Sequence, residues 1–136
     1  MKKVVILLIV TVLVFALSLP ALSQTEAKYI VSGNGTMDDN FSFSLAIAAT
    51  YPSLTPSGHL RIHGLNCVAI EAKIDCTVSP AATFTCNNPA GPSFTVDVST
   101  GGPGEGTIIL HGSSEDQTFT VREGSINCGE VGGETN

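Results

Sequence analysis

The sequence predicts an all-β fold, either an antiparallel β-sandwich or a small β-barrel of about eight or nine short strands. Apolar and polar residues alternate along most of the chain, as is typical of strands with one face on a core and the other in water. Clusters rich in glycine, proline, asparagine and serine separate the alternating segments at roughly even spacing. Because no segment has a convincing helical period, these patterns together favour strands joined by turns.

The first 23 residues predict a secretory signal peptide. Two lysines precede an apolar run over residues 4–19, and the small residues Ala21 and Ser23 stand at the −3 and −1 positions of a cleavage site before Gln24. The run is close to the minimum length of a membrane-spanning helix, but Pro20 and the small residues favour cleavage. We therefore expect a secreted protein, extracellular or at the cell surface, whose mature chain has no stable membrane insertion.

The remaining residues, 24–136, suit a single domain with a modest core. We expect a secreted all-β domain over 24–128 and a disordered tail over 129–136, because that tail is rich in glycine and glutamate. Removing the two leader lysines changes the formal net charge from −6 to −8. This sign repels phosphate backbones, so we expect no nucleic-acid partner.

Alternation predicts which residues face the core along the mature chain. The predicted core-facing residues are Phe41, Phe43, Leu45, Ile47, Leu60, Ile62, Val68, Ile70, Phe94, Val96, Val98, Ile108, Leu110, Phe119 and Val121. The turn-forming clusters between them lie at residues 33–35, 52–58, 79–80, 87–92, 101–106 and 112–114.

The four cysteines predict two disulfides. Cys67, Cys76, Cys86 and Cys128 are even in number, follow the predicted leader and lack C-x-x-C spacing. A tight turn around Pro80 would place Cys76 opposite Cys86, which favours that bridge and leaves Cys67–Cys128 as the long-range link. The alternative pairing is Cys67–Cys76 with Cys86–Cys128.

Several segments occur in an order that resembles a known family. These segments are Val31–Met37, Phe41–Phe43, Gly58–Ile62, Ala82–Cys86, Ser93–Thr100 with Gly102-Pro103-Gly104, and Glu123–Asn127. Over about Tyr29 to Cys128 the chain resembles the post-COAP domain, a small β module of large secreted and cell-surface bacterial proteins. The resemblance implies a structural or adhesive role, and it carries over no catalytic residue.

The candidate ligand face outside the loops is the segment His59, Arg61 and His63. At this spacing the three side chains share one face of a strand while Leu60 and Ile62 point to the core. Two imidazoles on one face could hold a metal ion with a third ligand, but the guanidinium between them repels a cation. We therefore interpret the face as solvated and expect no metal site and no cofactor.

The segment from His111 to Asp116 places a base, hydroxyls and carboxylates in a row, and we interpret it as a polar hairpin loop. Recognised catalytic motifs are absent from the sequence. We expect a binding or structural module and not an enzyme, with loops at one end of the fold contacting an extracellular protein or surface ligand. The alternatives are a small secreted hydrolase, or a protease inhibitor that presents the loop Gly101–Gly106.

Overall fold

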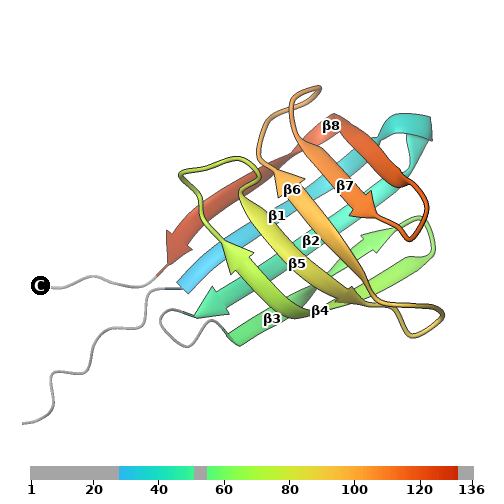
Figure 1. The fold of residues 1–136 in the computed structure, drawn as a ribbon. Helices are drawn as coiled ribbons and strands as arrows, with labels where there is room; N and C mark the ends of the chain where they lie inside the picture. The colour runs from blue at the N-terminus through green and yellow to red at the C-terminus, as the bar shows by residue number, and fades with distance from the viewer. Residues whose placement is uncertain (1–27, 51–54, 132–136) are drawn as a thin grey trace, which may run out of the picture.

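In the computed structural model, which describes residues 28–50 and 55–131, eight antiparallel strands close into a barrel (Figure 1). Each strand pairs with the next along the chain, and the last pairs back with the first. The strands are β1 (Lys28–Met37), β2 (Ser42–Thr50), β3 (Thr55–Ile62), β4 (Leu65–Ile74), β5 (Ala82–Asn87), β6 (Phe94–Ser99), β7 (Thr107–His111) and β8 (Asp116–Val131). The predicted all-β fold is confirmed, and closure into a barrel decides between its two forms. The predicted signal peptide, residues 1–23, lies outside the described residues.

Side chains fill the barrel interior. A barrel of about eight strands encloses a space just wide enough for packed side chains, and alternation delivers apolar residues to it from every strand. The largest buried side chains are Phe84, Met37, Leu45, Ile47, Leu60, Ile108, Ile126, Val31, Val96, Val98 and Val121. Within the described part of the chain no polar or charged side chain is buried, so the core is held by apolar packing.

Close contact between β1 and β8 depends on a pair of glycines. Gly35 and Gly124 are register partners, and their φ angles of +148° and +83° disfavour residues with a Cβ. A Cβ on Gly124 would overlap the carbonyl oxygen of Asn34, and one on Gly35 would overlap that of Glu123. These glycines therefore let the first and last strands approach and close the barrel.

The prediction that Val68 and Ile70 face the core is wrong. They are 50% and 49% exposed, whereas Cys67 and Ala69 of the same strand are buried. Both faces of this part of β4 are apolar, so alternation alone does not decide its orientation. The disulfide from Cys67 to Cys86, which is buried on β5, turns the cysteine face inward.

The prediction of a disordered tail from residue 129 is wrong for its first three residues. β8 continues through Val131 and pairs with β1, where Ile30 faces Gly129, Tyr29 faces Glu130 and Lys28 faces Val131. Backbone pairing does not need apolar side chains, so the polar composition of this segment gave no sign of it. Residues 132–136 lie outside the described residues.

All four cysteines form disulfides, but the predicted pairing is wrong. The bridges join Cys67 to Cys86 and Cys76 to Cys128, a pairing that matches neither prediction. β4 ends at Ile74 and β5 begins at Ala82, so Cys76 lies in the loop between them. The expected tight turn around Pro80 is therefore a wider loop, and Cys86 faces Ala69 in the ladder.

The Cys76–Cys128 bridge crosses one end of the barrel. β4 and β8 are four strands apart in a ring of eight, so they form opposite walls. The loop 75–81 leaves β4, is joined through Cys76 to Cys128 of β8, and buries Ala81. We call this end, which also holds the loop 100–106 and the paired ends of β1 and β8, the disulfide end (Figure 1).

The opposite end of the barrel carries the hairpin connections 38–41, 63–64, 88–93 and 112–115 (Figure 1). We call it the groove end. Its apolar side chains, including Phe41, Leu65, Phe94, Leu110 and Phe119, pack on the core but are only partly buried. Phe41 lies in the connection before β2, and the other four belong to the inward-facing rows of their strands, at the point where the rows reach solvent.

Candidate functional site

A groove of about 620 Å³ lies at the groove end, beside the hairpin between β7 and β8. Its apolar lining comes from three strands and from the loop before β6, and its polar lining comes largely from the β7–β8 hairpin and the start of β6. The lining residues are Leu65, Pro92, Ser93, Phe94, Thr95, Leu110, His111, Gly112, Ser113, Ser114, Glu115 and Gln117. The groove thus combines an apolar surface with polar groups at its rim.

The alternation of β6 and β7 explains why apolar and polar groups meet here. Phe94 is two residues before the buried Val96, and Leu110 is two residues after the buried Ile108, so both continue inward-facing rows. Thr95 and His111 have the opposite orientation and are register partners on the outer face. Inward and outward rows both border the groove because the strands end there.

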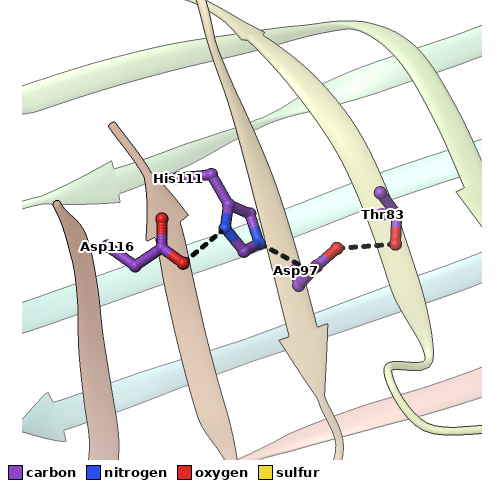
Figure 2. A network of polar contacts seen from close by, with 4 residues as sticks. All are labelled: Thr83, Asp97, His111 and Asp116. Carbon is purple, nitrogen blue, oxygen red and sulfur yellow. Dashed lines mark hydrogen bonds and ion pairs between the residues drawn. The ribbon is translucent and has the colours of Figure 1, made fainter. Parts of the chain in front are cut away.

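His111 is the centre of a polar network across four neighbouring strands. Figure 2 shows Thr83, Asp97, His111 and Asp116 in a row from β5 to β8. The Nε2 atom of His111 lies 2.6 Å from an oxygen of Asp97, and its Nδ1 atom lies 3.1 Å from an oxygen of Asp116. The other oxygen of Asp97 accepts a hydrogen bond of 2.7 Å from the Thr83 hydroxyl. The network ties the β7–β8 hairpin to β5 and β6.

This geometry favours a charged His111. A neutral imidazole has one donor nitrogen and one acceptor nitrogen, whereas the imidazolium donates from both. Carboxylate oxygens accept hydrogen bonds, so two carboxylates satisfy both nitrogens only when the ring is protonated. The hydrogen bond to Asp97, followed by the one to Asp116, raises the pKa of His111 above its usual value. The side chains are partly shielded, with 34% of His111 and 24% of Asp97 exposed.

A second polar contact fixes the connection between β1 and β2. One oxygen of Asp38 accepts a hydrogen bond of 2.8 Å from the backbone N–H of Thr120. The other accepts one of 2.7 Å from Nε of Arg122 and lies 2.6 Å from its Nη2 in an ion pair. The Thr120 amide, followed by Arg122, lowers the pKa of Asp38. The turn of 3-10 helix η1 (Asp38–Asn40) is thereby held against β8.

The predicted ligand face on β3 is divided in the structure. His59 and Arg61 lie on the outer face of β3, whereas His63 lies in the turn after it and stacks on Phe41 with ring centroids 4.6 Å apart. Among residues 28–50 and 55–131 there is no group of three histidine, cysteine or acidic side chains placed to hold a metal ion. Arg61 and His63 line one depression, which does not include His59, so the three predicted residues do not all meet.

The loop considered for protease inhibition is paired with β8. Gly101 and Ile126 exchange two backbone hydrogen bonds of 3.1 and 3.0 Å, and Gly106 accepts one of 2.8 Å from Val121. A loop that adds to a protease as an extended strand needs free backbone groups. The segment Pro103–Glu105 is exposed, but it forms a tight turn whose flanks are already bonded.

Sequence reasoning found part of the site. It singled out the loop from His111 to Asp116, but it did not connect Asp97 or Thr83 with His111. Those contacts depend on the register of two strand pairs, β5–β6 and β6–β7, and the polar positions of alternating segments were the available signal. The groove itself was missed, although Phe94 and Leu110 were correctly predicted to point toward the core side.

No helix within the described residues has the length and apolar character needed to cross a membrane.

Comparison with known proteins found no family model, no curated protein and no solved structure that matches this chain. The resemblance to the post-COAP domain therefore stays a prediction. What is shown is an all-β barrel with two disulfides, which is typical of proteins from oxidising compartments.

Proposed function

We propose that this protein is a secreted binding module that takes its ligand in the groove at the groove end. The observation that carries the proposal is the groove of about 620 Å³, with Phe94 and Leu110 in its apolar wall and polar groups at its rim. Ligand sites are commonly concave, mostly apolar and about 300–1,000 Å³ in volume, with a few placed polar groups. The predicted leader and the two disulfides support export of the module.

Binding is favoured over catalysis by the arrangement of His111. A general base needs a ring nitrogen within hydrogen-bond reach of the group that it deprotonates. Both nitrogens of His111 contact carboxylate oxygens, so the ring is occupied as a structural donor. The network therefore supports a rigid rim for a ligand groove better than the hydrolase alternative.

The proposal is tested with octan-1-ol as an uncharged apolar probe in a ¹H–¹⁵N NMR titration. We expect shift changes centred on Phe94, Leu110 and the hairpin loop 112–115. Ser93 lies in the groove lining and is exposed, so Ser93→Trp fills the groove without disturbing the core. Ser57→Trp is the matched control, because Ser57 is an exposed residue of β3 outside the groove.

We expect Ser93→Trp to abolish the shifts and Ser57→Trp to leave them unchanged. Shifts that are scattered over the barrel, or that persist in Ser93→Trp, would overturn the groove as the binding site. Export is tested separately, because the mature protein should begin at Gln24 when its N-terminus is sequenced.

A further inference from the structure

His111 beside the groove is paired with carboxylates, and Glu115 is the carboxylate of the groove lining. Glu115 and His111 are the charged side chains among the described residues that line it. The imidazolium of His111 already faces Asp97 and Asp116, at 2.6 and 3.1 Å. Glu115 is therefore the one carboxylate in the groove lining, and Asp97 and Asp116 offset the charge of His111 within the network.

The carboxylate of Glu115 is available to a ligand. Glu115 is exposed, and within the described part of the chain its side chain takes part in no hydrogen bond or ion pair. The Arg122 guanidinium is bound to Asp38, and Arg61 lines a separate depression that meets this groove at Leu65. The groove thus presents an unpaired negative group beside an apolar wall.

We propose that the groove takes a ligand in which an apolar chain carries a cationic group, with the class represented by a primary alkylamine. The apolar chain would lie against Phe94 and Leu110, and the ammonium group would lie at Glu115. A carboxylate on the same chain would face Glu115, and like charges at close range repel. This inference rests on the proposed function, because it names the chemistry of the ligand in that groove.

The expected selectivity is modest. An exposed ion pair contributes little, and at low salt it should favour the amine over the matched alcohol by about fivefold. Salt screens exposed charges over about 10 Å at 0.1 M, so the preference should shrink as salt is added. The apolar contribution should remain, since it does not depend on ionic strength in this way.

The test compares three probes of equal chain length, octylammonium, octan-1-ol and octanoate, by NMR titration at pH 6 and 20 mM salt, below their aggregation limits. We expect the affinity order octylammonium, octan-1-ol, octanoate. In Glu115→Gln the advantage of octylammonium over octan-1-ol should disappear. Glu130→Gln is the matched control, because Glu130 is an exposed residue at the disulfide end of β8 and its removal changes the net charge equally.

The possible results separate the cationic ligand, the role of Glu115 and the proposed function from one another. Equal binding of the three probes in the groove would overturn the cationic ligand and leave the proposed function standing. Loss of the amine preference in Glu130→Gln as well would show attraction to the net charge of the chain and overturn the role of Glu115. Absence of groove shifts with all three probes would overturn both proposals.

Discussion

At the disulfide end, a covalent bridge joins opposite walls of the barrel, whereas at the groove end apolar side chains stay partly exposed around a groove. The Cys76–Cys128 bridge crosses the first end, where Ile74 at the end of β4 and Ala81 in the loop 75–81 are both buried. Leu110 and Phe94 occupy comparable inward-facing rows at the second end, yet solvent reaches them. The other bridge, Cys67–Cys86, joins the neighbouring strands β4 and β5 near the groove end and does not cover that end. The difference indicates that the groove end is the one available for recognition, since binding residues usually lie on loops held by a rigid scaffold.

The largest expected effect on stability comes from removing the Cys76–Cys128 bridge at the disulfide end. Replacing both Cys76 and Cys128 by serine should lower the free energy of unfolding by about 4 kcal/mol, because the bridge closes a long loop in the unfolded chain. The bridged residues are 52 apart in the sequence. Urea unfolding of the oxidised proteins measures the change. Peptide mapping provides the control, and a peptide that joins Cys76 to Cys86 would contradict the pairing.

The packing of the two ends can be compared by truncating one isoleucine and one leucine, whose side chains are isomers. Ile74→Ala removes a buried side chain at the disulfide end and should cost about 3 kcal/mol, as large-to-small substitutions in cores do. Leu110→Ala, at the groove end, should cost about half as much because the side chain is already partly exposed. Chemical denaturation of both variants gives the ratio of their losses in free energy of unfolding. Equal costs would show that the groove end is packed as tightly as the disulfide end.

The sequence predicted the fold class and most inward-facing residues because alternation reports directly on burial. Val96, Val98, Leu60 and Ile108 were correctly assigned to the core on this basis. Alternation failed where both faces of a strand are apolar, as at Val68. In that segment the Cys67–Cys86 disulfide decides which face of β4 points inward, and no local sequence pattern indicates this pairing.

The disulfide pairing and the polar network could not be derived because both depend on how strands are placed in three dimensions. Cys76 meets Cys128 only after the eight strands have closed into a ring. His111 and Asp116 are register partners in one hairpin, so their contact has a local signal. Asp97 joins them from β6, and the groove forms where several strands end together.

Acidic groups at the two ends should differ in their effect on acid stability. Hydrogen bonds lower the pKa of Asp38 at the groove end, chiefly from the Thr120 amide, and of Asp75 at the disulfide end, chiefly from the Thr77 hydroxyl. A lowered folded-state pKa gives stability that is present above the ordinary value of 3.8 and is lost as the pH falls through the folded pKa.

We therefore expect Asp38→Asn to reduce the loss of stability below about pH 4 more than Asp75→Asn does, because a guanidinium also binds Asp38. Urea unfolding at a series of pH values between 2 and 6 gives both slopes. An acid slope that neither substitution changes would show that these two carboxylates do not determine acid stability.

The smallest expected effect on stability belongs to His111, and its sign is opposite. Its two carboxylate partners raise its pKa above 6.5, so the contribution is fully present below 6.5 and is lost as the pH rises through the folded pKa. Stability should therefore fall as the pH rises above 6.5, and His111→Gln should remove that slope. Unfolding measurements between pH 5 and 9 test this.

The protonation of His111 can also be observed directly at the groove end. ¹⁵N NMR at pH 6 should show protons on both ring nitrogens. Asp97→Asn should lower the pKa of His111 more than Asp116→Asn does, because Asp97 is the nearer and less exposed partner, at 2.6 Å against 3.1 Å. A single ring proton at pH 6, or the reverse order of the two variants, would mean that the imidazole is not the double donor that holds the β7–β8 hairpin. The rim of the groove would then lack the rigidity that distinguishes it from an ordinary surface loop.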